Sequence, residues 1–395
     1  MANNNENKVL NVPNLRFPEF TEVWKVERLD EIATLSKGVG ISKEQLSNDG
    51  EPCILYGELY TKYKSEIIKE IDSRTNIDNS KLKRSKANDV IIPCSGETAI
   101  DIATARCVPF DNILLGGDLN IISLYQYDGA FMSYQLNGKR KYDIAKVAQG
   151  VSVVHLYGEH LKAIFIYNPC LQEQQKIAQI LSLLDERIAT QNKIIEDLKK
   201  LKSAIIDRLY ENIDGPPCLY GDLLTVVNEK NKMMEYSNIL SASQEFGMIE
   251  RNDLNIDIKY EKNAITGYKI VREGDYVVHL RSFQGGMAFS QMVGVCSPAY
   301  IILRPNDRLS YGYLAPYFTS TSFINSLRLV TYGIRDGRSI NVDEWLNMKV
   351  CIPSLEVQRH ILSIINSIEC KLLNEIKIAD NLLKQRSYLL SQMFI

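Results

Sequence analysis

Metal-binding and nucleotide-binding signatures are missing from this sequence. The eight cysteines include no CxxC pair, and the four histidines do not stand near them at the spacing of metal ligands. A phosphate-binding loop of the form GxxxxGK[ST] is missing as well, which argues against ATP-driven work by this chain. Neither a GxSxG nucleophile motif nor the carboxylate clustering of a metal nuclease is present. We therefore expect no catalytic residue and no metal site in this chain.

Long apolar runs are also missing. No stretch of 18 apolar residues exists, and the polar start MANNNENKVLNVPN has neither the basic beginning nor the apolar core of a signal peptide. The expectation is a cytoplasmic protein with reduced thiols and no membrane contact. The net charge of −2 argues against non-specific nucleic-acid binding by the whole surface, although it leaves room for a local basic face.

One uninterrupted stretch, residues 171–210, dominates what is present. Apolar residues recur there every three or four positions, or every seven where a polar residue intervenes, which is the pattern of a long amphipathic helix. Neither proline nor glycine interrupts it, and the sequence DGPP at 214–217 follows as a helix stop and linker. At ~1.5 Å per residue the helix would be roughly 60 Å long, which is more than an ordinary core helix needs.

The same helix occurs twice. A shift of 184 residues places residues 168–210 on residues 352–394 without a gap, and polar interruptions of the apolar stripe coincide, as Lys202 does with Arg386. Because each polar seam residue costs stability in a helix pair, shared interruptions indicate an internal duplication of about half the chain. The residues expected to form the pairing seam and the partner interface are Ile177, Leu181, Leu184, Ile188, Ile195, Leu198, Ile361, Ile365, Ile368, Leu372, Leu382 and Leu389.

Two arrangements of the helices are open. Each could cover only a core of its own, or the two could pair with each other. Antiparallel pairing fits best, because a duplication that closes on itself gives pseudo-two-fold symmetry. One register places Lys202 opposite Glu375 and Gln191 opposite Arg386. Apolar residues outside the seam would then need a partner protein.

The segment before each helix has the pattern of a mixed α/β globule. Short β-type runs are expected at 53–56, Asp89–Pro93, 113–115, 120–127 and 161–167, and helices at 27–35 and 130–136. In the second half, residues 273–278 correspond to 87–92, a strand at 297–303 and a helix at 314–326 follow, and residues 348–352 lead into the second long helix. Because the globules share a plan but little sequence, we expect a common frame that carries two different surfaces.

Basic and polar turn segments of the globules are candidates for duplex binding. Lysine and arginine runs can neutralise phosphates, while Arg, Gln and carboxylate side chains can read guanine, adenine and cytosine edges. An ordinary solvated loop explains each single segment about as well. The candidate DNA-binding residues are Tyr60, Lys62, Tyr63, Lys81, Lys83, Arg84, Lys86, Ser95, Glu97, Thr98, Lys139, Arg140, Lys141, Arg281, Ser282, Phe283, Gln284, Arg335 and Arg338.

The length of the helices suggests a mechanism. Antiparallel helices roughly 60 Å long would hold two readers more than one duplex turn apart, since base pairs stack at intervals of ~3.4 Å. The protein would then read two short words separated by an unread gap. Because the globules differ, the two words should differ.

These residues also resemble a known family. The sequence PCLQEQQKIA at 169–178 looks like the conserved region of type I restriction–modification specificity subunits, and LRFPEF at 15–20 resembles their usual start. The sequences SGET at 95–98 and SPAY at 297–300 are similar to phrases of their target-recognition domains. The resemblance covers essentially the whole chain, and the helix motif is its most specific part.

The expected fold is α+β, with two globular mixed α/β target-recognition domains joined by two long antiparallel coiled-coil helices in an internal pseudo-two-fold duplication. The expected segments are a flexible leader at 1–14, a first target-recognition domain at 15–167, a conserved helix at 168–214, a second domain at 215–351 and a second conserved helix at 352–395. The second helix departs from the family pattern at Val357, Leu362 and Glu369, so its partner contacts need not equal those of the first.

The resemblance implies a subunit without enzymatic activity that binds a bipartite, asymmetric sequence in double-stranded DNA. Its partners would be two methyltransferase (modification) subunits and two restriction/translocase subunits, and S-adenosylmethionine, ATP and magnesium would belong to those partners. Two other functions stay open. A coiled-coil assembly protein would bind no duplex specifically, and a stand-alone methyltransferase would bind S-adenosylmethionine as the isolated chain.

Overall fold

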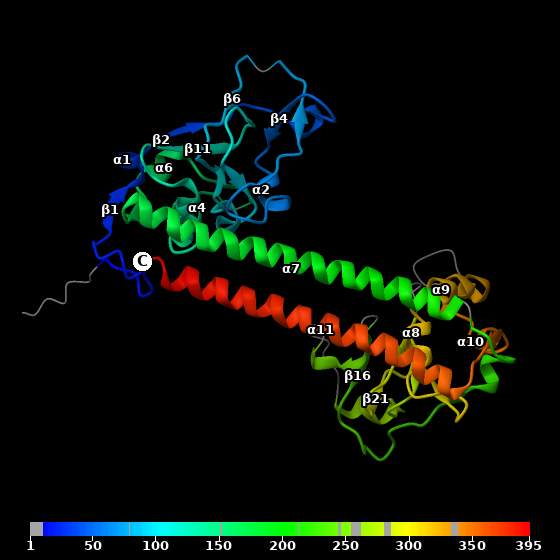
Figure 1. Ribbon diagram of the computed structural model, residues 1–395. Helices are drawn as coiled ribbons and strands as arrows, with labels where there is room; N and C mark the ends of the chain where they lie inside the picture. Colours follow the sequence, from blue (N-terminus) through cyan, green and yellow to red (C-terminus); the bar gives the residue numbers. More distant parts are fainter. Residues whose placement is uncertain are drawn as a thin grey trace, which may run out of the picture. The chain divides into compact units, whose positions relative to one another are not determined.

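A computed structural model describes residues 11–78, 80–150, 152–211, 213–243, 246–253, 262–279, 286–332 and 339–395 (Figure 1). The chain divides into two compact units: the first unit is Met1–Asn192 with Lys377–Ile395, and the second unit is Lys193–Ile376. Both divisions fall inside long helices, so each unit contains one globule and a part of each long helix. The five segments expected from the sequence stay a prediction.

The two long helices carry the duplicated sequence. α7 (Leu171–Glu211) has 41 residues and α11 (Leu355–Gln392) has 38, which confirms both helices. Each begins two residues after a proline, Pro169 or Pro353, at the same place in the duplication. Each proline lies just outside the helix, and its carbonyl accepts a hydrogen bond from the side chain of the buried glutamine five residues later.

The frame of the first unit is a four-stranded antiparallel sheet in the order β2 (Ala33–Lys37), β11 (Leu119–Leu124), β7 (Asp89–Pro93) and β9 (Arg106–Val108). Both faces of β7 are covered. Ile92 packs in a cluster with Met132 of helix α4 (Gly129–Asn137), whereas Ile91 faces a cluster with Ile54. A strand that is covered on both faces is mostly apolar, as residues 90–93 of β7 are.

The first unit also holds a mixed sheet and two strand pairs. The sheet has the order β3 (Leu46–Ser47), β5 (Arg74–Thr75), β4 (Glu51–Ile54), β10 (Leu114–Leu115) and β6 (Lys83–Arg84). The pairs are β1 (Lys25–Arg28) with β13 (Phe165–Asn168) and β8 (Ser95–Gly96) with β12 (Val154–His155). The short helices are α1 (Leu29–Ile32), η1 (Lys43–Gln45), α2 (Glu58–Thr61), α3 (Ala99–Ile102), α5 (Lys141–Val147) and α6 (Gly158–Lys162).

The second unit repeats the frame with the order β15 (Leu224–Val227), β22 (Ile301–Pro305), β19 (Tyr276–Val278) and β20 (Met287–Phe289). Around it lie four pairs: β14 (Pro217–Leu219) with β25 (Lys349–Cys351), β16 (Leu240–Ser243) with β17 (Gly247–Glu250), β18 (Lys269–Val271) with β21 (Gly294–Cys296), and β23 (Thr331–Tyr332) with β24 (Ser339–Ile340). The short helices are η2 (Tyr220–Asp222), η3 (Arg251–Asp253), η4 (Lys262–Gly267), α8 (Leu314–Tyr317), α9 (Thr321–Ser326), η5 (Leu327–Val330) and α10 (Val342–Leu346).

The turn before the central strand confirms the duplication at the level of single residues. Asn88 and Gly274 both have positive φ, 80° and 90°, in the left-handed region that asparagine and glycine tolerate best. One residue later, the buried carboxylates of Asp89 and Asp275 each accept a hydrogen bond of 2.8 Å from the backbone N–H three residues upstream. The alignment of 87–92 with 273–278 is therefore structurally correct.

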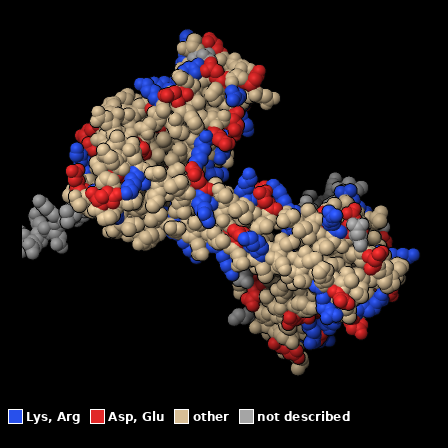
Figure 2. All heavy atoms as spheres, viewed as in Figure 1, with Lys and Arg blue, Asp and Glu red and all other residues tan. Residues whose placement is uncertain are grey.

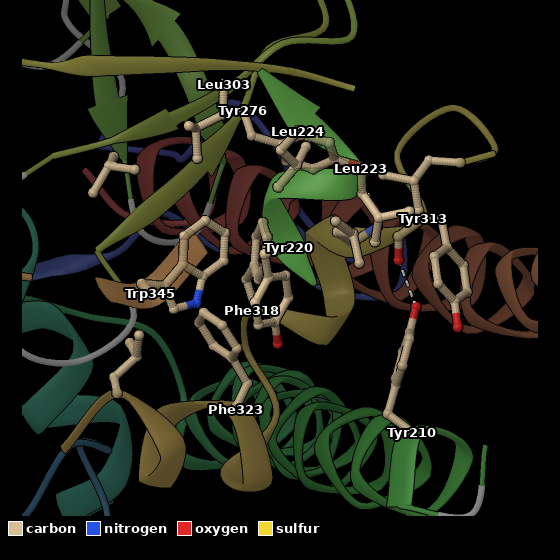
Figure 3. Packing of buried hydrophobic residues seen from close by; sticks show 14 of the residues in the cluster. Tyr210, Tyr220, Leu223, Leu224, Tyr276, Leu303, Tyr313, Phe318, Phe323 and Trp345 are labelled. Carbon is tan, nitrogen blue, oxygen red and sulfur yellow. Dashed lines mark hydrogen bonds between the residues drawn. The ribbon is translucent and has the colours of Figure 1, made fainter. Parts of the chain in front are cut away.

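An aromatic core lies at the centre of the second unit (Figure 3). Trp345 is fully buried and stacks on Tyr220 with ring centroids 4.3 Å apart. The rings of Phe318 and Phe323 meet Trp345 edge to face. Such pairs of aromatic rings are worth about 0.5–1.5 kcal/mol beyond the area they bury.

Within each unit the two long helices run antiparallel. In the first unit the beginning of α7 shares a core with the end of α11, through Ile177, Leu181 and Leu389 (Figure 1). In the second unit the end of α7 shares a core with the beginning of α11, through Ile206 and Ile361. Every predicted seam residue is buried or half-buried. The antiparallel arrangement is confirmed.

The expected register of the pair, however, is wrong by six residues. Lys202 forms its ion pair with Glu369 at 2.6 Å and not with Glu375. Arg386 likewise pairs with Asp185 at 2.5 Å, six positions before the residue expected. An apolar stripe alone does not set a register, and here the charged side chains do. A shift of 184 residues relates Asp185 to Glu369 and Lys202 to Arg386, so the two ion pairs are equivalent in the duplication.

Several short elements also differ from expectation. The helix expected at 27–35 is largely strand, because β1 and β2 flank a single turn of helix. Residues 158–162 are helical where the beginning of a strand was expected, and the strand expected at 297–303 begins only at Ile301. The helix expected at 314–326 is interrupted at Ser320, whose hydroxyl caps the second piece. Tertiary pairing overrides local periodicity in such short segments.

Two buried glutamines link the first turns of the long helices to the globules by hydrogen bonds. We expect each to contribute about 1–3 kcal/mol to the free energy of unfolding. Gln174 accepts from the backbone N–H of Asp128 at 2.9 Å and donates to the carbonyl of Pro169. Gln358 does the same with Ser310 and Pro353. Replacement by alanine would leave buried backbone groups unpaired.

Urea unfolding of the full chain checks this expectation. Gln174→Ala and Gln358→Ala should each lower the free energy of unfolding by about 1–3 kcal/mol. The exposed Gln172 of the same turn is the matched control, and its alanine variant should stay within about 0.5 kcal/mol of the unsubstituted chain. Equal effects of Gln172→Ala and Gln174→Ala would contradict the role of the buried amides.

Candidate nucleic-acid interface

The first candidate group lies at the carboxyl end of β7, where the chain leaves the sheet. Ser95 begins β8, and the Tyr60 hydroxyl donates to its carbonyl at 2.9 Å. Burial raises the pKa of Tyr60, so this phenol stays protonated and remains a donor. Glu97 and Thr98 follow on the surface, and the Thr98 hydroxyl caps α3 by accepting from the backbone N–H of Asp101. The structure therefore brings Tyr60, Ser95, Glu97 and Thr98 together.

Sequence reasoning missed the residues that join this group from later in the chain. The pairing of β8 with β12 places His155 opposite Ser95, with 3.3 Å between Nδ1 and Oγ. Tyr157 lies next to His155, and the Lys37 ammonium lies 5.7 Å from the centre of the tyrosine ring. The signal in the sequence is the polar and aromatic segment HLYGEH at 155–160.

A second candidate group, the basic run at 81–86, lies at the other end of β7. Lys81, Lys83 and Lys86 are exposed, and Arg84 forms an ion pair with Glu51 at 2.6 Å. The strand separates this run from Ser95 by roughly 15 Å, at ~3.3 Å per residue. The two candidate groups of the first unit are therefore distinct patches.

Other candidates are occupied inside the fold. Tyr63 is 7% exposed, and packing within the first unit accounts for it. Lys62 makes ion pairs with Glu58 and Asp72. Arg140 donates to the backbone carbonyl of Ile395 at 3.1 Å and pairs with Asp143, while its exposed neighbour Lys139 and half-buried Lys141 flank it. Arg281, Ser282, Phe283, Gln284, Arg335 and Arg338 lie outside the described residues.

A buried ionic cluster joins the first globule to both helices. The Arg386 guanidinium bridges Asp185 of α7 and Glu66 of the globule, at 2.5 Å from each carboxylate. Burial lowers the pKa of Arg386, but hydrogen bonds to the two carboxylates outweigh it and raise the pKa overall. Burial and the neighbouring Asp185 also raise the pKa of Tyr134, whose hydroxyl donates to that carboxylate at 2.7 Å.

On the face shown in Figure 2, the charged side chains of the described residues form no continuous basic patch. In the view of Figure 2, lysine and arginine side chains lie interspersed with aspartate and glutamate on the surface of each unit. Among the described residues, no three His, Cys, Asp or Glu side chains gather as metal ligands. In the same part of the chain, no helix is long and apolar enough to cross a membrane.

Comparison with known proteins finds a related domain in the first half of the chain. Residues 21–200 match the model of the type I restriction modification DNA specificity domain. The chain is 28% identical over 200 residues to the specificity subunit of the type I restriction enzyme MjaVIII of Methanocaldococcus jannaschii, and the aligned part covers 50% of this chain. Residues 21–200 of this chain are therefore similar to the DNA specificity domain of type I restriction–modification enzymes. The alignment spans 43% of the length of that relative, less than half of it.

Solved structures of low sequence identity share the fold of this chain. The type I S subunit from M. genitalium superimposes with a TM-score of 0.58 and 17% identity, covering 97% of this chain and 99% of the other. A chain from a study of complex assembly and conformational transition in the type I R-M system superimposes with a TM-score of 0.60 and 14% identity, covering 95% of this chain and 98% of the other. At these identities the likeness concerns the fold. The DNA-contact residues predicted for this chain stay predictions.

Proposed function

We propose that this chain is the non-catalytic DNA-recognition subunit of a type I restriction–modification complex. It reads a bipartite, asymmetric site, with one half read by each globule. The observation that carries the proposal is a duplicated frame with unlike additions. Both units have the same four-stranded sheet order, but the first adds a five-stranded sheet and the second adds separate strand pairs. A shared frame with two different surfaces suits the reading of two different words.

The long helices supply the second part of the proposal. Two exposed apolar side chains of α7 lie on one side of the helix in each unit, Ile180 and Leu183 in the first and Ile194 and Leu201 in the second, each pair within about 60° at 100° per residue. Exposed apolar pairs of this kind suit a partner helix or globule. We assign them to the methyltransferase subunits, two per complex, to which two restriction/translocase subunits add. S-adenosylmethionine, ATP and magnesium would be bound by those subunits.

Mapping of methylated adenines tests this proposal. The full chain is purified with its methyltransferase subunit, incubated with plasmid DNA and S-adenosylmethionine, and the modified adenines are sequenced. The expected result is two short words separated by a gap of fixed length. Exchange of residues 15–167 for the corresponding domain of another specificity chain should change one word and keep the other.

The alternatives give different results in the same experiment. A single contiguous word would contradict a bipartite reader. A coiled-coil assembly protein would give no sequence-specific modification with or without the partner. Binding of S-adenosylmethionine by the isolated chain would instead favour a stand-alone methyltransferase.

A further inference from the structure

Five side chains of the first unit form a polar and aromatic cluster at the carboxyl end of β7, which we call the Tyr157 cluster: Lys37, Ser95, His155, Tyr157 and His160. The His155 ring stacks beside Tyr157 with centroids 6.2 Å apart, and His160 meets the Tyr157 ring edge-on at 5.6 Å. The Lys37 ammonium lies over the same ring, and Ser95 contacts His155. The cluster draws on β2, β8, β12 and the start of α6, so the fold has assembled it from four places.

The cluster is both accessible and held in place. Tyr157 is 44% exposed, although two histidine rings and a lysine surround it. An exposed tyrosine with fixed neighbours loses little side-chain freedom when it binds a partner, because its rotamer is already restricted. Phenol, imidazole and hydroxyl groups can each donate or accept a hydrogen bond, whereas the ammonium donates only. The cluster therefore offers a pre-arranged row of polar groups at the surface.

The second unit places a similar pair at the corresponding edge. His279 directly follows β19, the counterpart of β7, and its ring lies 6.3 Å from the ring of Tyr300. Its Nε2 is buried and has no hydrogen-bond partner among the described residues. A duplication that otherwise keeps little of the globule sequence has thus put imidazole and phenol groups at the same sheet edge twice.

We propose that the Tyr157 cluster contacts duplex DNA in the half-site read by the first unit. Lys37 binds a backbone phosphate, and Tyr157, His155 and Ser95 face the base edges of the word. An ammonium group fixes register on the duplex without reading sequence, while groups that both donate and accept can distinguish base edges. The inference rests on the proposed function and adds which edge of the first unit meets the bases.

Selection from a randomised duplex library, using the full chain in complex with its methyltransferase subunit, tests the inference. Dissociation constants are then measured at fixed salt for the selected site and for sites altered in one word. Tyr157→Ala should weaken binding to the selected site about 5- to 100-fold and remove discrimination in one word only. Lys37→Ala should weaken binding to all sequences alike and lower the slope of log K against log salt by about one.

Tyr125→Ala is the matched control. Tyr125 is a 62% exposed tyrosine of the same unit that contacts Thr34, at the opposite end of β2 from Lys37. This variant should bind within about two-fold of the unsubstituted chain. Far-UV circular dichroism checks that each variant is folded, and Lys37→Ala serves as an independent test if Tyr157→Ala is not.

The outcomes separate this inference from the proposed function. If the unsubstituted complex selects a bipartite site but Tyr157→Ala and Lys37→Ala bind like Tyr125→Ala, the cluster is not the contact and the proposed function stands. If the unsubstituted complex selects no site, the proposed function fails and the inference fails with it.

Discussion

Replacement of Arg386 by alanine is expected to lower the free energy of unfolding of the first unit by about 3–5 kcal/mol. The guanidinium is the shared partner of Asp185 and Glu66, whose side chains are 10% and 9% exposed. Without it, two carboxylates would stay close together and away from water, with the charge of Arg106 and the hydroxyl of Tyr134 near them but no direct ion pair to Arg386. The loss exceeds the value of one ion pair, because the unpaired charges that remain are themselves costly.

The duplication provides a matched control for Arg386. Lys202 occupies the equivalent position in α7, and its partner Glu369 is 44% exposed. Because water screens that pair, Lys202→Ala should cost no more than about 1 kcal/mol. The only two tryptophans, Trp24 and Trp345, lie in different units. Trp24 fluorescence in a Trp345→Phe background therefore follows urea unfolding of the first unit for Arg386→Ala, and Trp345 fluorescence in a Trp24→Phe background follows the second unit for Lys202→Ala.

The two variants together decide the interpretation. An Arg386→Ala effect below about 1 kcal/mol, or one equal to that of Lys202→Ala, would show that the buried cluster does not hold the globule to the helices. A large effect confined to Arg386→Ala would mean that the two equivalent ion pairs contribute differently to the free energy of unfolding, because only the pair of Arg386 is largely buried.

The long helices could be predicted from the sequence, but their register could not. An apolar stripe of period three and four specifies a helix and a buried face, and the shift of 184 residues specifies that two such helices are equivalent. It does not specify which residues lie opposite, since many registers bury the same stripe. Both copies have an acidic residue at the same position, Asp185 in the first and Glu369 in the second. Each pairs with the basic residue of the other helix, Arg386 or Lys202, and these two pairs define the register.

The candidate interface could be predicted only where it is local in sequence. Ser95, Glu97 and Thr98 follow an apolar strand directly, so their position at a sheet edge was evident from the pattern. His155 reaches Ser95 only through the pairing of β8 with β12, two-residue strands too short to show any period. A basic run alone does not identify a DNA contact, because Arg140 pairs with Asp143 and donates to a backbone carbonyl inside the fold.

The second large effect is expected at Trp345, whose replacement by alanine should lower the free energy of unfolding of the second unit by about 3–5 kcal/mol. The indole is fully buried against Tyr220, Phe318 and Phe323 (Figure 3). Truncation would remove its contacts and leave a cavity among rings that cannot all move inward.

Trp345→Phe separates the loss of volume from any loss of hydrogen bonding. The indole Nε1 has no partner among the described residues, so phenylalanine removes no bond seen there and should cost only about 1–2 kcal/mol. In both variants Trp24 is the single remaining tryptophan. Far-UV circular dichroism then follows unfolding of the whole chain and Trp24 fluorescence follows the first unit, so a change seen by circular dichroism without one in Trp24 fluorescence belongs to the second unit. Equal losses for Trp345→Phe and Trp345→Ala would mean that the core depends on the indole itself and not on the volume it fills.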